Sequence, residues 1–329
     1  MDVSRRTALA GMAAATAFAS DSSQPLLAQD ASALRQAPGY YRYRVGDALV
    51  TAVTDGANSF PLPERFVANA SREDVASALV ADFRDGATLT VPFTPIVIET
   101  AGRRIVVDTG NGEAAFQASK GAVGQFQTNL QAAGFDRAAI DMVIISHFHG
   151  DHVNGLLTAD GQPAFPKAEI FVPDAEWTYW MDDGAMSRAP AGRLQDVFRN
   201  TRRVFDALGR KVTRYAWDRE VAPGLTAIGT PGHTPGHTSL LLDSSGSNLF
   251  VQSDVTNIPV LFARKPSWHV MYDQDPAAAE ATRRKVYDRV SSERLLLQGF
   301  HYPFPAVGHV EKVADGYREV LAPWNPVLR

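Results

Sequence analysis

The chain has 329 residues, of which 45% are hydrophobic and 21% charged, and its formal net charge is -4. This composition can bury a sizeable core, and the small negative charge disfavours a nucleic-acid partner, so a small-molecule substrate is expected. The absence of cysteine excludes disulfides, thiolate nucleophiles and cysteine-bound zinc. Any metal must therefore be held by nitrogen and oxygen ligands.

Residues 1–28 have the pattern of a twin-arginine export signal. The pair Arg5-Arg6 precedes a short apolar run that ends at Ala19. This run is shorter than the roughly 20 residues that a membrane span needs, so no stable membrane anchor is expected. We predict a periplasmic or secreted protein with a flexible linker over residues 29–38 and one catalytic domain over residues 39–329.

Beyond the linker, short β-rich runs alternate with helical runs, and no fixed-period repeat is present. Strands are expected over residues 49–53, 88–99, 104–107, 142–145, 169–172, 225–228, 239–242 and 249–252. Helices are expected over residues 194–208 and 276–290. This pattern predicts a layered α/β architecture in which one domain has two similar halves.

The most informative segment is an apolar strand that ends in the motif H-x-H-x-D-H. It supplies His147, His149, Asp151 and His152 within six residues. Because alternate residues of a strand point the same way, His147 and His149 can face one ion, and the turn at Gly150 can direct the other two towards a second ion. Three of the eight histidines of the chain lie here, which favours a metal site over a surface loop that is rich in histidine.

Further ligands are expected at the ends of other strands, since four groups cannot complete two metal shells. The segment after residue 228 carries His233 and His237 in a doubled Thr-Pro-Gly-His motif, and one of the two should complete the first site. Asp254 follows the next strand and can bridge two cations. His301 repeats the pattern of a strand followed by a ligand.

These motifs resemble the metallo-β-lactamase-fold hydrolases, and within them methyl parathion hydrolase and its lactonase-like and arylesterase-like relatives. The resemblance extends from Ala37-Pro-Gly-Tyr-Tyr41 to the segment 301–309 and includes Val107-Asp-Thr-Gly110. It implies an αββα sandwich with two mixed β-sheets flanked by helices. The site is then expected in a cleft where strand-end loops of the two sheets converge.

The resemblance also implies a ligand set. One metal ion is held by His147, His149 and His237; the other is held by Asp151, His152 and His301; Asp254 is shared. His233, His269 and His309 match no ligand position. Asp108 and Asp55 are expected either to support the ligands or to shape turns. Two departures are Gln252-Ser253, where a Gly usually precedes the aspartate, and Gly150, where methyl parathion hydrolase has a Pro.

The expected cofactor is a pair of divalent metal ions, with zinc favoured and manganese, cobalt or iron compatible with the ligands. Such a pair lowers the pKa of a shared water towards about 7, which makes a bridging hydroxide the expected nucleophile. Asp151 and Asp254 are the catalytic carboxylates of this interpretation. Phe116, Trp180 and Phe198 are predicted to line a pocket for an aryl leaving group, with core packing as the alternative.

The predicted reaction is hydrolysis of an aryl phosphotriester, an ester or a lactone. A glyoxalase-like thioester hydrolase and a β-lactamase remain alternatives, as does a persulfide dioxygenase with mononuclear iron. A non-catalytic metal-binding export protein is the alternative from another class. A homodimer is expected because dimers are common in this family.

Overall fold

The computed structural model describes residue 37 and residues 39–328. The predicted export signal lies outside the described residues and stays a prediction. Within the described part of the chain, no helix is both long enough and apolar enough to cross a membrane.

The first sheet has seven strands in the order β1-β2-β5-β6-β7-β8-β9. The neighbours from β1 to β6 are antiparallel, and those from β6 to β9 are parallel. Its strands are β1 (Tyr40–Val45), β2 (Ala48–Val53), β5 (Ile96–Thr100), β6 (Arg103–Val107), β7 (Met142–Ile144), β8 (Glu169–Pro173) and β9 (Thr213–Tyr215). Every residue of β7 is buried, as expected for a parallel strand that is covered on both faces.

The second sheet also has seven strands, in the order β10-β11-β12-β13-β14-β15-β16. Only β13 and β14 are parallel, and the long helix α9 lies between them in the chain. Its strands are β10 (Glu220–Ala222), β11 (Leu225–Gly229), β12 (Thr238–Ser244), β13 (Ser247–Ser253), β14 (Leu296–Gly299), β15 (Val307–Val313) and β16 (Gly316–Leu321). Both sheets are therefore mixed, as predicted.

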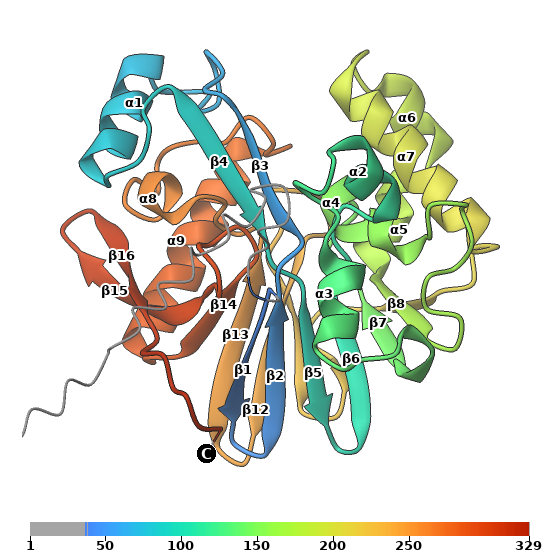
Figure 1. The fold of residues 1–329 in the computed structure, drawn as a ribbon. Helices are drawn as coiled ribbons and strands as arrows, with labels where there is room; N and C mark the ends of the chain where they lie inside the picture. The colour runs from blue at the N-terminus through green and yellow to red at the C-terminus, as the bar shows by residue number, and fades with distance from the viewer. Residues whose placement is uncertain (1–36, 38, 329) are drawn as a thin grey trace, which may run out of the picture. The chain divides into compact units, whose positions relative to one another are not determined.

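The alternation of side chains along the strands creates three layers of core. In β6, Ile105 and Val107 point between the two sheets, whereas Val106 points towards the helices on the other face. In β13, Val251 shares the layer between the sheets, and Phe250 packs on the opposite side with α9. Figure 1 shows α3, α5 and α7 beside the first sheet and α9 beside the second, which confirms the predicted αββα sandwich.

The helices are α1 (Arg72–Ala81), α2 (Glu113–Ala118), α3 (Phe126–Ala132), α4 (Gly150–Val153), α5 (Asp174–Trp180), α6 (Asp183–Arg188), α7 (Arg193–Ala207), α8 (Pro259–Phe262) and α9 (Pro276–Ser292). The predicted helices over residues 194–208 and 276–290 correspond to α7 and α9. Helix α9 begins where its sequence indicates, because Asp275 caps it by accepting a hydrogen bond from the Ala278 N–H and Pro276 occupies the first turn.

The strand predicted over residues 88–99 is two strands. Strand β4 (Thr88–Phe93) pairs with β3 (Gly56–Pro61) in a separate two-stranded ribbon, and the chain then enters the first sheet as β5. Pro95 separates them because it has no N–H group to continue a ladder of hydrogen bonds. This ribbon packs with α1 and α8 in a further hydrophobic cluster. Figure 1 shows the ribbon rising beyond the upper edge of the sheets.

A titratable group in this scaffold gives a test of the fold. Burial raises the pKa of Glu319, on β16, to about 7, and its Oε1 atom has no hydrogen-bond partner among the described residues. The protonated form of Glu319 is therefore favoured by folding. Its contribution to the free energy of unfolding is fully present below the unfolded pKa of about 4.5 and is lost as the pH rises through 7. We expect Glu319→Gln to become more stable than the native protein over this window, by on the order of 2 kcal/mol above pH 7. Urea unfolding of both proteins at several pH values measures the difference, and a difference that is constant with pH would contradict the prediction.

Candidate metal centre

The potential ligands come from four segments that each follow the end of a strand. The H-x-H-x-D-H segment follows β7, His233 follows β11, Asp254 follows β13, and His301 follows β14. Strands β11, β13 and β14 run in one direction, so their ends meet at one edge of the second sheet. This topology explains why residues far apart in the sequence lie together.

One group of ligands consists of His147, His149 and His233. The ring atom Nδ1 of His149 lies 3.2 Å from Nε2 of His147 and 2.9 Å from Nε2 of His233. All three side chains are buried, and their ligand atoms lie within 4.8 Å of one another. Three nitrogens at this spacing can surround one cation.

A second group consists of Asp151, His152 and His301. The Oδ2 atom of Asp151 lies 3.5 Å from Nε2 of His152 and 3.5 Å from Nε2 of His301. The two imidazoles are buried, whereas the Asp151 side chain is 23% exposed. Asp151 is thus the member of this group that can reach a bound molecule most directly.

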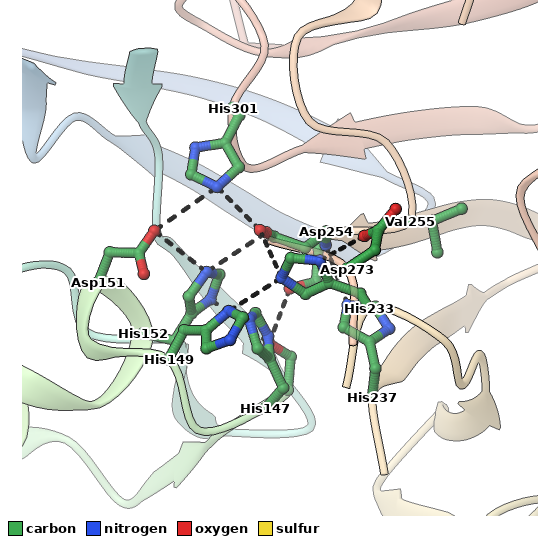
Figure 2. A network of polar contacts seen from close by, with 12 residues as sticks. His147, His149, Asp151, His152, His233, His237, Asp254, Val255, Asp273 and His301 are labelled. Carbon is green, nitrogen blue, oxygen red and sulfur yellow. Dashed lines mark hydrogen bonds and ion pairs between the residues drawn. The ribbon is translucent and has the colours of Figure 1, made fainter. Parts of the chain in front are cut away.

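The carboxylate of Asp254 lies between the two groups (Figure 2). Its Oδ1 atom is 3.3 Å from Nε2 of His152, and its Oδ2 atom is 2.9 Å from Nε2 of His301. The same Oδ2 atom is 3.3 Å from Nε2 of His233. One carboxylate therefore reaches both groups, which is the arrangement that a shared ligand requires.

The structure corrects the sequence prediction for the doubled histidine motif. His237 was expected to be the ligand, but both of its ring nitrogens bind the protein itself. Nδ1 contacts Thr230, and Nε2 accepts a hydrogen bond from the backbone N–H of Asp254 at 3.0 Å. His233, which was expected to be a turn residue, instead directs Nε2 towards His149. The sequence places both histidines in one turn, but the path of that turn decides which of them faces the other ligands.

The electrostatics of the centre suit divalent cations. Burial lowers the pKa of His147 and His149 well below its ordinary value, and neighbouring imidazoles lower it further, so both rings are neutral at neutral pH. Burial opposes ionisation of Asp254, yet the imidazoles of His301 and His152 hold its pKa well below the usual range. Burial opposes protonation of His152 and His301, yet neighbouring carboxylates, chiefly Asp108 for His152 and Asp254 for His301, raise the pKa of both rings. Metal ions bind deprotonated imidazole nitrogens and carboxylates, so a cation bound to these two rings would displace their protons.

Two buried atoms at the centre of the site lack hydrogen-bond partners among the described residues. They are Nε2 of His152 and Oδ1 of Asp254, which face each other. Leaving a buried polar group unpaired is costly, and a cation between the two ligand groups would satisfy both atoms. The residues therefore fit two divalent metal ions, as predicted.

Asp108 supports the ligands from behind, as one of its two predicted roles required. Its carboxylate contacts Nδ1 of His152 at 2.8 Å and accepts hydrogen bonds from the backbone and the hydroxyl of Ser146. Asp55 has the other role and shapes loops. It accepts hydrogen bonds from the backbone N–H groups of Asn111 and Phe126, and burial raises its pKa to about 6.

No motif in the sequence indicates that Glu176 belongs to the site. This buried carboxylate on α5 accepts hydrogen bonds from the N–H of Phe148, between two ligands, and from the N–H of Gly236, beyond His233. It therefore joins two ligand loops from different sheets. A glutamate in an amphipathic helix has no local pattern that predicts such a contact.

The unusual residues before Asp254 also have an explanation. Ser253 adopts φ 52°, in the left-handed region that favours the glycine usual at this position. Its hydroxyl lies 2.7 Å from that of Ser146, so a side-chain hydrogen bond accompanies the strained backbone.

His269 and His309 bind Glu280 and a backbone carbonyl, respectively, and lie outside the ligand groups, as predicted.

A cavity of about 300 Å³ opens onto the ligands. It is lined by Asn58, Phe60, Val91, Phe93, Asn111, His149, Gly150, Asp151, Asn154, Arg193, Val197, His233, Asp254, Asn257, Tyr272 and His301. The ribbon β3–β4 supplies the apolar side chains of Phe60, Val91 and Phe93, and four of the other lining residues are asparagines.

The predicted aromatic pocket residues do not line this cavity. Trp180 and Phe198 are fully buried in the core beside the first sheet, where their rings lie 4.6 Å apart and the Trp180 indole N–H is bound by Glu176. Phe116 lies on α2 and is 38% exposed. The prediction of a substrate role for Trp180 and Phe198 was wrong, because core packing accounts for both rings. A substrate role for Phe116 stays a prediction.

Comparison with known proteins agrees with this geometry. Residues 94–286 match the protein family described as the metallo-beta-lactamase superfamily. An N-acyl homoserine lactonase of Bacillus cereus is 28% identical over 188 residues, which cover 53% of this chain and 67% of that enzyme. The chain thus spans about two thirds of the length of this curated relative.

Solved structures show the same fold. The structure of AidC, a dizinc quorum-quenching lactonase in complex with a product, has a TM-score of 0.79 and 23% identity, and the match covers 87% of this chain and 98% of AidC. The structure of AbOPH, a hydrolase in the beta-lactamase superfamily, has a TM-score of 0.80 and 24% identity and covers 88% of this chain and 100% of AbOPH.

The assignment of His233 rather than His237 as a metal ligand can be tested by measuring the metal content of variants. After saturation with zinc and removal of free metal, we expect the native protein to retain two ions per chain and His233→Ala to lose one. His237→Gln should retain both, because the Gln carbonyl can accept the hydrogen bond from the Asp254 N–H. Loss of an ion from His237→Gln, with two retained by His233→Ala, would contradict the assignment.

Proposed function

The chain belongs to the metallo-beta-lactamase superfamily of metal-dependent hydrolases, and on that premise we propose that it is a dizinc lactonase that opens the ring of an N-acylated lactone. The observation that carries this proposal is the carboxylate of Asp254 between two ligand groups on the floor of the cavity. The curated relative from Bacillus cereus is an N-acyl homoserine lactonase, and AidC is a dizinc lactonase, which supports both the substrate class and the metal.

The ligand residues support hydrolysis of an ester bond. Two bound divalent ions supply Lewis acidity for the ester carbonyl and a hydroxide nucleophile at neutral pH. The carboxylate of Asp254 would offset part of the repulsion between two such ions, because it lies between the two ligand groups. Partial desolvation opposes ionisation of Asp151, yet the imidazoles of His152 and His301 lower its pKa to about 2, so this residue is ionised at the wall of the cavity. No protein nucleophile is needed.

The walls of the cavity match an acylated lactone better than an aryl phosphotriester. Phe60, Val91 and Phe93 form an apolar surface on the β3–β4 ribbon, on which an acyl chain can pack. Asn154 and Asn257 offer amide groups that can bind an amide or ester of the substrate. Two of the three rings expected to stack on an aryl leaving group, Trp180 and Phe198, instead lie in the core, so an aryl phosphotriester is included in the assay as a competing substrate.

Other reactions receive less support from the site. A persulfide dioxygenase needs one iron, whereas two ligand groups share Asp254 here. The cavity opens directly onto the ligands, which favours an enzyme over a protein that only stores metal. Thioesters and β-lactams contain an acyl group that the same centre could attack, so they belong in the same assay.

The proposed activity is tested by kcat/KM on N-hexanoyl homoserine lactone, an aryl ester, an aryl phosphotriester, a thioester and a β-lactam. We expect kcat/KM for the lactone to exceed kcat/KM for each other substrate by roughly 10-fold or more, because contacts in the cavity stabilise the transition states of different substrates to different extents. Asp254→Ala should lower the lactone activity by ~100-fold or more because it removes the shared ligand. A phosphotriester that exceeds the lactone would overturn the substrate assignment, and equal rates for native protein and Asp254→Ala would overturn the site.

A further inference from the structure

Arg283 is a fully buried cation on α9, at the edge of the metal centre. Its side chain is 1% exposed, and it lies on the face of the helix that also buries Val286 and Tyr287. Burying a guanidinium is costly unless its donors are bound, so its position at this depth calls for an explanation. None of the sequence motifs points to this residue.

The donors of Arg283 bind several segments around the centre. Its Nε atom donates to the carbonyl of Val255 at 3.1 Å, and Nη1 donates to the carbonyls of Pro266 and Trp268 at 2.8 Å each. Its Nη2 atom lies 3.3 Å from Oδ2 of Asp273. One side chain thus holds the residue that directly follows Asp254 together with the loop that leads from α8 to α9.

Asp273 connects Arg283 to a ligand. Its Oδ1 atom lies 2.9 Å from Nδ1 of His233, and its side chain is 1% exposed (Figure 2). An acceptor at Nδ1 keeps the proton on that nitrogen and leaves the lone pair of Nε2 directed towards His149 and Asp254. The backbone strengthens this contact, because the N–H of Gln274 donates to the carbonyl of His233 at 3.1 Å.

The two ligand groups are supported differently. Asp108, which orients His152, binds the backbone and the hydroxyl of Ser146. Asp273, which orients His233, binds the guanidinium of Arg283. Substitution of Asp273 or Arg283 should therefore weaken binding of the ion expected at His147, His149 and His233 more than binding of the other ion.

We propose that Asp273 and Arg283 are positioning residues that hold His233 and the strand end at Asp254 in the geometry required by the first metal ion. Asp273 fixes the orientation of the His233 ring. Arg283 fixes Asp273 and, through the Val255 carbonyl, the backbone beside the shared carboxylate. Neither residue needs to contact substrate, so the proposal does not depend on which ester the enzyme hydrolyses.

The test measures the affinity of each site for zinc in the metal-free full-length chain, by titration against a competing chelator. Asp273→Asn has nearly the native shape, but its amide cannot accept from both His233 and Arg283, so one buried donor loses its partner. We expect Asp273→Asn to weaken one of the two ions by ~10- to 100-fold and to leave the other nearly unchanged. Arg283→Met should weaken the same ion by as much and the other ion by less, because Arg283 also holds the backbone beside the shared carboxylate. Arg284→Met is the matched control, because Arg284 is the next residue of α9, is partly exposed and pairs with Glu280.

A second readout separates positioning from general stability. Cobalt(II) absorption of the loaded proteins reports the coordination of each ion, and we expect the bands of only one site to change in Asp273→Asn. Circular dichroism of the metal-free variants verifies folding, and if Arg283→Met does not fold, Asp273→Asn decides alone. Equal weakening of both ions, or native affinities and spectra in a folded Asp273→Asn protein, would overturn the proposal.

Discussion

The structure depends on keeping a shared carboxylate and its imidazole partners buried and facing one another. Asp254 and His152 each place an atom in the same interior space that has no hydrogen-bond partner in the part of the chain that the structure describes, an arrangement that is costly in the absence of a cation. The surrounding protein compensates with buried carboxylates that bind the ligand loops from behind. Asp108 binds His152 in the loop after β7, and Asp273 binds His233 in the loop after β11. Glu176 binds the backbone of both loops, so the ligands that follow the two sheets are held together.

The sheet topology explains how this cluster forms. The strands that precede His233, Asp254 and His301 run in one direction in the second sheet, and β7 delivers the first histidine motif from the other sheet. Alternating side chains on β6 and β13 fill the layer between the sheets and bring the strand ends together. The cavity then opens between these ends and the β3–β4 ribbon, which leaves the ligands accessible from one side.

The sequence predicted the parts of the site that rest on local patterns. The H-x-H-x-D-H segment, Asp254 and His301 all follow apolar strands, and the structure brings them together. The sequence alone could not distinguish His233 from His237 as the ligand, because both lie in one Gly/Pro-rich turn whose direction depends on contacts with α9. Gly232, for example, approaches the backbone of α9 so closely that a side chain would collide with it. The roles of Glu176 and Arg283 could not be predicted for the same reason, since both residues contact segments that are distant in the sequence. The burial of the aromatic residues on α5 and α7 also depends on tertiary packing, which no local pattern reveals.

The most direct test of the central claim is an anomalous-scattering experiment on crystals of the zinc-loaded protein, with data collected on both sides of the zinc absorption edge. If Asp254 and His233 are ligands, two peaks both contact the carboxylate of Asp254, one of them about 2.0–2.1 Å from Nε2 of His233, and no ion is bound to His237. A single peak, or an ion coordinated by Nε2 of His237, would contradict the claim.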